Sequence, residues 1–421
     1  MKRAPAVVLV IVALAAGVGI GVLASKGFSG SPAASPVANV PGASGSGQPS
    51  ASSSGGPSDG GSSSPSASPS DVPSPTPTPA PTPVLLADAL DGLMVAPSLA
   101  KRHVVAVMID DLNAARPQSG LSKASIVWQA EAEGGIPRYM ALFSENVAPA
   151  IGPVRSSRLY FIAWAAEWNA VYVHVGGSPQ ALALLHSAQG KGSVVYDADE
   201  FRWAPTYLWR IKTRLAPHNV YTDTKHLVAL SKRVGAKVLV NYKAHWQFAP
   251  DAPLDQRPVG GTITVPYPQN VIKYSYDRTT NTYFRTVSAE GRQVDAGTKL
   301  AIAPKNVVVM FMSIAPLNDG SKKHRVEAQY IGSGVAWIST NGQTVKGKWK
   351  KATLTGPTLF YGPDGKPATL TAGQTFVNVV RLGTTVTFKA GKPAPAPSPA
   401  PSDSPSPSPS GAVTGAWRLV F

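Results

Sequence analysis

The alternation of apolar and polar positions changes along the chain and indicates two folded regions. In residues 85–250, short apolar runs rich in β-branched residues predict strands at 103–110, 125–133, 138–144 and 170–177. Helical spacing or capping residues predict helices over 155–168, 178–188 and 222–235. Strands that alternate with helices indicate an α/β or α+β domain with a mixed sheet.

Residues 257–392 have a different pattern. Short alternating runs such as "VIKYSYD" and "TFVNVVRL" are separated by turn residues. This pattern is typical of antiparallel strands and predicts a β-rich C-terminal domain.

Ser, Pro, Gly, Ala and Thr make up most of residues 29–84 and 393–410. Such segments cannot bury enough apolar surface to offset the entropy of ordering, so we expect a disordered linker and a disordered insertion. The apolar end "GAVTGAWRLVF", residues 411–421, is a candidate for a last strand that returns to the fold.

The first 28 residues predict a membrane helix. Lys2 and Arg3 precede an uncharged apolar run that continues to Ala24. As a helix, residues 6–24 would span roughly 28 Å, close to the hydrocarbon thickness of a bilayer. The positive amino end favours the cytoplasm, so we expect a single-pass signal anchor in the cell membrane with extracytoplasmic folded domains. The alternative is a cleaved signal peptide, although its apolar core is usually only about 7–15 residues.

Composition narrows the expected partners. The formal net charge is +16, and the chain has no Cys, which excludes disulfides and a lipid anchor on cysteine. Outside the membrane the available polyanions are wall polymers and lipid head groups, although a solvated basic surface would give the same charge. No nucleic-acid-binding motif occurs, so we expect no nucleic acid as partner. The expected partners are an envelope polymer or an envelope protein. The N-terminal helix is expected to contact the membrane.

Four segments carry a resemblance to a known family. They read "VAVMIDDLNAARPQSGLSKASIVWQAEAEGGIPRYMALF", "IGPVRSSRLYFI", "VHVGGSPQAL" and "PHNVYTD". In this order they resemble the YerB-like lipoprotein family, a domain of unknown function, and the likeness covers most of residues 85–390. The resemblance implies a bacterial, membrane-tethered, extracytoplasmic protein and no established reaction. The type member is anchored by a lipid, whereas this chain lacks the required Cys.

The segment "GPVRSSR" suggests an anion site at a helix start. Arg155, Ser156 and Arg158 would join free helix amides there, and this combination suits a phosphate or carboxylate. We also place Arg116 in this pocket. The alternative is internal pairing with one or more acidic residues at nearby strand ends, namely Asp110, Asp111, Glu131 and Glu133.

A second strand-to-helix turn, "HVGGSPQAL", adds three candidate ligand-binding residues. Gly176 and Gly177 would let the backbone approach a ligand, and the helix amides after Ser178 would donate to it. Simple capping of the helix by Ser178 is the alternative.

Two histidines and one aspartate are candidate catalytic residues. His174 ends a predicted strand, His218 lies in "APHNVY", and Asp110 ends another strand. Ligands usually gather at strand ends of α/β sheets, so His174 and Asp110 are expected to face one crevice. A purely structural role for each histidine is the alternative.

The stretch "FRWAPTYLWR" mixes aromatic rings with arginines. Trp203, Tyr207 and Trp209, with Arg202 and Arg210, predict either a sugar-stacking or partner surface or a core beneath a loop.

Metal ligands and cofactors are not expected, because the seven histidines form no metal-binding spacing and no nucleotide-binding loop occurs.

The function that follows is a membrane-tethered extracytoplasmic protein that binds an anionic envelope ligand or an envelope protein. The alternative is a hydrolase or transferase acting on envelope glycan or phosphate, with His174 or His218 as acid or base, Asp110 as orienting carboxylate and the arginines as clamp. The sequence has no recognisable catalytic triad and no set of metal ligands, so a binding protein is preferred over an enzyme.

Overall fold

The computed structural model describes residues 83–188 and 194–394. The expected membrane helix, almost all of the linker and the expected last strand lie outside these residues. Within the described part, no helix is long and apolar enough to cross a membrane.

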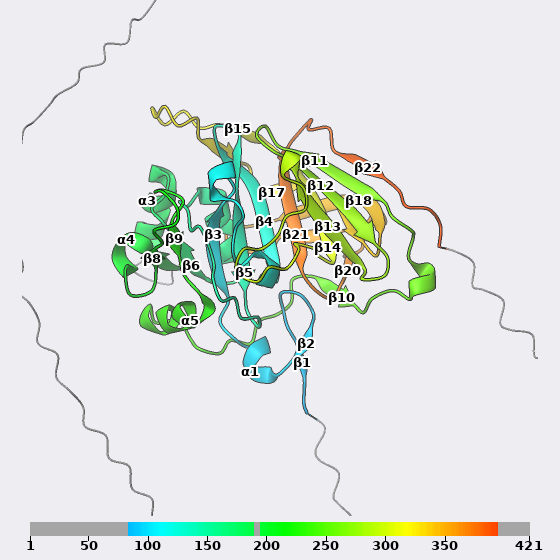
Figure 1. Cartoon of the computed structure of the whole chain (residues 1–421), viewed down its shortest axis with the longest axis horizontal. Coiled ribbons are helices and arrows are strands. Elements are labelled where there is room, and N and C mark those ends of the chain that lie inside the picture. The colour runs from blue at the N-terminus through cyan, green and yellow to red at the C-terminus, as the bar shows by residue number, and fades with distance from the viewer. Residues whose placement is uncertain (1–82, 189–193, 395–421) are drawn as a thin grey trace, which may run out of the picture. The chain divides into compact units, whose positions relative to one another are not determined.

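A ten-stranded mixed sheet forms the centre of the described fold (Figure 1). Its order is β19-β18-β17-β14-β21-β4-β5-β3-β6-β7. The strands, in this order, are Leu359–Tyr361, Gln343–Lys351, Gly332–Thr340, Asn306–Met312, Thr375–Arg381, Ile126–Glu133, Ile136–Phe143, Val105–Asp110, Val171–His174 and Tyr196–Asp199. Parallel pairs occur within β14-β21-β4 and within β3-β6-β7, and the other pairs are antiparallel.

The two predicted regions share this sheet. Strand β21 comes from the C-terminal region and pairs in parallel with β4 of the N-terminal region, with Phe376 opposite Val127. Figure 1 shows the two strands side by side in the middle of the sheet. A mixed-sheet N-terminal region and a β-rich C-terminal region are thus present as expected, and hydrogen bonds between strands join them.

Smaller elements surround the large sheet. A four-stranded antiparallel sheet has the order β13-β12-β11-β22, with bounds Thr282–Val287, Val271–Asp277, Thr262–Pro266 and Thr387–Lys389. Two-stranded sheets are formed by β1 with β2, β8 with β9, β10 with β20 and β15 with β16; these strands are Leu86–Ala87, Met94–Val95, Trp209–Arg210, Val220–Tyr221, Gln247–Ala249, Thr369–Thr371, Ile314–Pro316 and Val326–Ala328. The α-helices are α1 Pro97–Ala100, α2 Leu159–Ala166, α3 Pro179–Ala188, α4 Glu200–Trp203 and α5 Thr224–Arg233. Short 3₁₀ helices cover Asn113–Ala115, Leu121–Lys123, Leu254–Gln256 and Ser288–Glu290.

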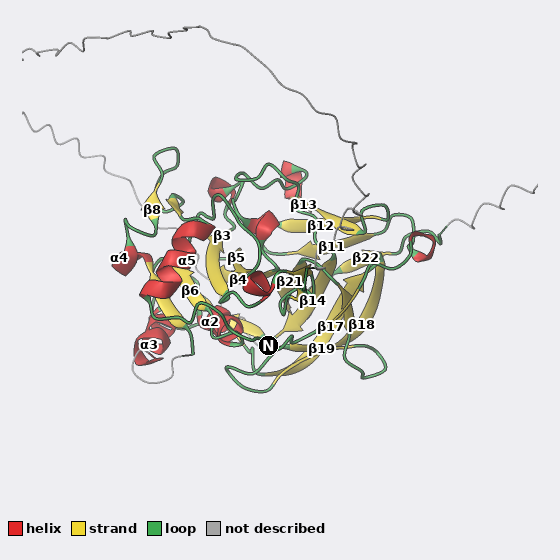
Figure 2. Ribbon diagram, turned by 90° about the horizontal axis from the view of Figure 1, so that it is seen from below, coloured by secondary structure: helices red, strands yellow, loops and turns green. Residues whose placement is uncertain are grey.

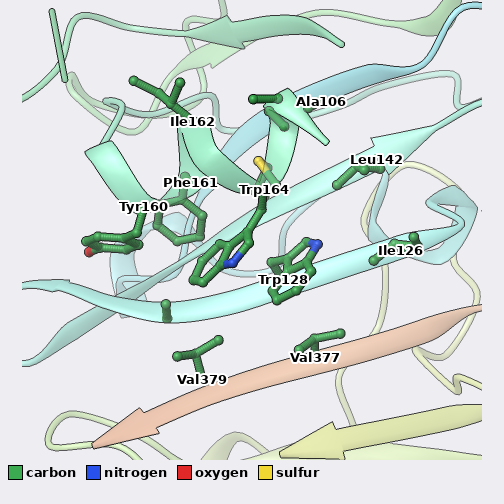
Figure 3. Packing of buried hydrophobic residues seen from close by; sticks show 14 of the residues in the cluster. Ala106, Ile126, Trp128, Leu142, Tyr160, Phe161, Ile162, Trp164, Val377 and Val379 are labelled. Atoms are coloured by element: carbon green, nitrogen blue, oxygen red, sulfur yellow. The ribbon is translucent and has the colours of Figure 1, made fainter. Parts of the chain in front are cut away.

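Helices α2 and α3 cover one face of the large sheet. Trp164 of α2 stacks on Trp128 of β4, with ring centroids 4.5 Å apart and planes 7° from parallel (Figure 3). Both rings are almost fully buried, and Tyr160 and Phe161 pack beside them. Aromatic rings of this size bury much apolar surface, so this contact anchors α2 to the sheet.

The other face is covered by helix α5 and the four-stranded sheet. Leu227 and Leu230 of α5 belong to the same buried cluster as Ile109 of β3 and Ile263 of β11. Figure 2 shows α5 and α3 on opposite sides of β6. Because both faces are covered, β3 is buried at all six positions, which explains why "VAVMID" is a continuous apolar run rather than an alternating one.

A buried polar network joins the two sheets. Asp111 Oδ2 accepts from Gln129 at 2.7 Å, and Gln129 Oε1 in turn accepts from Arg285 of β13 at 2.7 Å. These three residues are fully buried. Asp111 also pairs with Arg116 at 3.0 Å. Since buried polar groups need partners, this network fixes how the four-stranded sheet is seated.

Helix α2 is shorter than the sequence predicts. Arg155 N–H donates to Met108 O at 2.9 Å, and Ser157 forms a bridge with Gly177. Residues 154–157 are therefore held extended beside β3 and β6. The helix begins only at Leu159, with Arg158 as its N-cap and without a side-chain cap. The expectation that Arg155 lies in the first helical turn was wrong, because these contacts with neighbouring strands outweigh local helix propensity.

Candidate functional site

Asp110 is the centre of the first group of candidate residues. It lies at the carboxyl end of β3 and is 2% exposed. Its Oδ2 atom lies 2.6 Å from His218 Nδ1 and 2.9 Å from Arg155 Nε. The His218 side chain is 13% exposed, and its Nε2 atom has no hydrogen-bond partner among the described residues. Asp110 thus orients one histidine and binds one arginine.

Glu133, at the end of β4, is the centre of the second group. Its carboxylate lies 2.5 Å from Arg138 Nη2 and 2.5 Å from Arg158 Nη2. Arg138 is opposite Asp110 in the β3–β5 ladder, so the two groups adjoin. Burial would raise the pKa of Glu133, but Arg138 and Arg158 hold it below its ordinary value.

We call these residues the strand-end cluster: Asp110, Glu133, Arg138, Arg155, Arg158 and His218. It contains three guanidinium groups and two carboxylates. Burial, together with the charge of Arg138, lowers the pKa of Arg158 to about 10. Burial also lowers the pKa of Arg155, although Asp110 opposes this.

The cluster therefore carries a surplus of positive charge in a mostly buried place. The Arg158 side chain is 4% exposed, and its buried Nε atom has no hydrogen-bond partner within residues 83–188 and 194–394. Lys323 and Arg325 add to the positive potential. A buried cation without a full complement of partners is costly, and an incoming anion would offset that cost.

The structure assigns partners to both arginines of "GPVRSSR". Arg155 pairs with Asp110 and Arg158 pairs with Glu133, as the internal-pairing alternative expects. The other two acidic candidates go elsewhere, since Asp111 pairs with Arg116 and Glu131 pairs with Arg381.

Arg116 does not join the strand-end cluster. Besides Asp111, it binds Glu290 at 2.6 Å, and its side chain is 5% exposed. It therefore belongs to the network between the two sheets, and its placement in the expected pocket was wrong.

The serines of this segment do not cap helix α2. Ser157 Oγ lies 2.9 Å from Tyr172 Oη, and the Ser156 carbonyl accepts from Arg138 Nη1 at 3.0 Å. The expected role of Ser156 as an anion donor remains a prediction.

The glycine turn closes on the protein itself. The N–H of Gly176 donates to Asp199 Oδ1 at 2.9 Å, and its carbonyl accepts from Ser157 N–H. Gly176 has φ of 56°, where glycine is favoured, while a Cβ on Gly177 would lie 3.2 Å from that of Ser157. Ser178 Oγ accepts from Ala181 N–H at 3.3 Å, which supports the capping alternative.

His174 is separated from the other catalytic candidates. It is 0% exposed, with Nδ1 lying 2.8 Å from Gly176 O and Nε2 lying 2.7 Å from Asp197 Oδ1. It contacts neither Asp110 nor His218, so the expectation that His174 and Asp110 share one crevice was wrong. His218 takes the place beside Asp110 because the 211–219 loop brings it there.

Sequence reasoning missed two features. Arg138 follows the turn "GGIP" of the β4–β5 hairpin, but it lies opposite Asp110 through the β3–β5 ladder, which no local pattern indicates. Asp88, Asp91 and Glu145 are buried with ligand atoms within 4.8 Å of one another, which is the oxygen set that could hold a metal ion. Their oxygens already accept hydrogen bonds, for example from Ser144 and Leu90 N–H. The spacing "DALD" was the only local hint of this carboxylate group.

The fold and these strand ends define an α/β-type body with an attached antiparallel sheet, and comparison places it in a family. The chain belongs to the DUF3048 family: residues 90–237 match its N-terminal domain and residues 263–377 its C-terminal domain, both described as protein of unknown function. It is 29% identical over 299 residues to "Putative lipoprotein YerB" of Bacillus subtilis (strain 168), which covers 69% of this chain and 85% of YerB.

A solved structure has the same fold. The crystal structure of YerB from Bacillus subtilis matches with a TM-score of 0.64 and 25% sequence identity. The match covers 72% of this chain and 99% of that one. The resemblance found in the four sequence segments is thereby confirmed.

Proposed function

We propose that this chain is a membrane-held extracytoplasmic protein that binds an anionic group of the cell envelope at the strand-end cluster. The observation that carries the proposal is the charge surplus of three arginines over two carboxylates. Arg155 and Glu133 keep side-chain exposures of 18% and 21%, so the cluster has an accessible side. A phosphate or carboxylate there would gain charge-assisted hydrogen bonds from guanidinium groups.

The extracytoplasmic location rests on sequence and similarity. The name of the YerB relative refers to a lipoprotein, that is, a protein tethered to a membrane by lipid. This chain has no Cys, and its first residues offer an apolar segment of membrane-spanning length instead. We propose that a helix here replaces the lipid as the tether.

Sedimentation of the full-length protein with isolated bacterial cell walls tests the function. Arg155→Gln removes the surplus charge and leaves two arginines against two carboxylates. A lost charge-assisted hydrogen bond is worth about 1.5–3 kcal/mol, so we expect binding at least about tenfold weaker. Arg292→Gln is the matched control, since Arg292 is an exposed arginine outside the cluster. Equal binding by the wild type and Arg155→Gln would contradict the proposal.

A second function, hydrolysis or group transfer on an envelope phosphate or glycan, rests on the His218–Asp110 contact. An aspartate that orients Nδ1 leaves Nε2 to accept a proton, as a general base requires. The test is turnover of bis(p-nitrophenyl) phosphate by the wild type and by His218→Ala. The enzyme hypothesis is supported if the wild type turns the substrate over, His218→Ala does not, and both unfold alike. It is refuted if the wild type is no more active than His218→Ala.

A further inference from the structure

A polar cavity lies away from the strand-end cluster, between β7, α4 and the end of α5. Its volume is about 340 Å³, within the size range of small-molecule sites. Tyr196 and Asp197 line it from the edge strand of the large sheet, Arg202 and Trp203 from α4, and Arg233 from α5. Figure 1 shows both helices near β6, at one end of the large sheet.

The two arginines of this cavity are held by an aromatic ring rather than by carboxylates. The guanidinium carbons of Arg202 and Arg233 lie 5.0 Å and 5.4 Å from the centroid of the Trp203 ring. Neither arginine forms an ion pair or hydrogen bond with any residue that the structure describes. Stacking positions a guanidinium without using its N–H donors, so both groups remain able to bind an oxyanion.

Trp203 supplies a third unused donor. Its Nε1 atom is buried and has no hydrogen-bond partner among the residues that the structure describes. Buried polar atoms in proteins are almost always paired, and an unpaired one calls for an explanation. A ligand oxygen that displaces the side chains covering this atom would satisfy the indole N–H.

The opposite wall offers an acceptor. The carboxylate of Asp197 lines the cavity while its Oδ1 atom lies 2.7 Å from His174 Nε2. A carboxylate has about four lone-pair sites and can accept several hydrogen bonds at once, so Asp197 can accept from a ligand hydroxyl beside the contacts that it already makes within the protein. The cavity thus combines cationic donors on one side with a carboxylate on the other.

We propose that this cavity binds an anionic sugar, with its phosphate or carboxylate between Arg202 and Arg233 and its hydroxyls toward Asp197. The volume exceeds what a bare oxyanion needs, since a water molecule occupies about 30 Å³. The proposal goes beyond the function given above, because the cavity shares no residue with the strand-end cluster.

Calorimetric titration of the full-length Arg155→Gln variant tests the site, because this change weakens the oxyanion binding proposed for the strand-end cluster and leaves the cavity intact. The ligands are glucose 6-phosphate and glucuronate, with glucose and inorganic phosphate for comparison. We expect one of the two anionic sugars to bind at least tenfold more tightly than either comparison ligand, and the tighter one identifies the acid. Arg202→Gln and Arg233→Gln should each weaken that binding at least tenfold.

Two control variants separate this site from others. Arg292 stacks on Phe284 at 3.9 Å, so Arg292→Gln removes a similar stacked arginine elsewhere and should leave binding unchanged. The Arg155→Gln background is the second control, since it removes the oxyanion binding proposed for the strand-end cluster. The proposal is overturned if neither anionic sugar binds in this background, if inorganic phosphate binds there as tightly, or if neither Arg202→Gln nor Arg233→Gln weakens binding.

Discussion

Lys351→Met should strongly destabilise the fold, because it breaks a buried ion pair between the two regions. Lys351 ends β18, and its Nζ atom lies 2.8 Å from Glu167 Oε1 at the C-cap of α2. The two side chains are 0% and 1% exposed. Thr358 Oγ1 donates to the same carboxylate oxygen at 2.5 Å.

The expected cost follows from the charge left behind. Burial alone would raise the pKa of Glu167, but His245 and Lys351 hold it below its ordinary value, so the carboxylate is ionised. It also lies at the negative end of a helix dipole, where an anion is unfavourable. Removal of one partner from a buried pair costs about 3–5 kcal/mol. The double variant Glu167→Gln/Lys351→Met leaves no buried charge at this place and should recover at least about 2 kcal/mol of that loss.

Urea unfolding followed by tryptophan fluorescence measures these free energies. Lys350→Met is the matched control, since Lys350 is exposed on the same strand and should change stability by less than about 0.5 kcal/mol. If Lys351→Met costs no more than Lys350→Met, the pair does not stabilise the contact between β18 and α2 and the reasoning fails.

Two further predictions concern stability. Burial and the charge of Glu145 raise the pKa of Asp88 from 3.8 to about 6 and that of Asp91 to about 8. Because both folded-state pKa values are raised, the stability that these two groups contribute is fully present below about pH 4 and is lost as the pH rises to about 8. Asp88 alone contributes about 3 kcal/mol to this loss. Asp91→Asn should flatten this pH profile, and an equally steep profile in the variant would count against it. Trp164→Ala should cost about 3–5 kcal/mol in urea unfolding because it empties the stacked site, whereas a cost below 1 kcal/mol would show that the ring does not anchor α2.

Local patterns predicted the elements better than their pairing. The run "VAVMID" indicated a buried strand because both of its faces are covered. The pairing of β21 with β4 joins residues about 250 positions apart, as Thr375 opposite Ile126 shows. No local pattern specifies such a partner, so the sequence suggested two regions but not their shared sheet.

The candidate site was predictable in kind but not in detail. The sequence raised both a ligand anion and internal pairing for Arg155 and Arg158, and Asp110 and Glu133 were among the carboxylates considered. Which carboxylates pair depends on where residues 154–157 run beside β3, and that path is set by tertiary contacts. Arg138 was missed because its neighbour Asp110 lies on β3, and the pairing of β3 with β5 joins strands that are not consecutive in the chain.

The stretch "FRWAPTYLWR" shows the same limit. It was expected to be either a sugar-stacking or partner surface or a core beneath a loop. Leu208 is buried, Phe201 is 75% exposed, and Trp203 lies between core and cavity. Since the spacing of aromatic residues in a short irregular segment does not specify a face, only the structure separates these positions.

The most direct test of the central claim is an anomalous difference map from crystals of the protein grown with selenate, an oxyanion whose selenium can be located. The account predicts a selenium peak within hydrogen-bonding reach of Arg155 and at least one of Arg138 and Arg158. A strand-end cluster with the same ion pairs and no peak, in crystals where selenate is bound elsewhere on the protein, would contradict it.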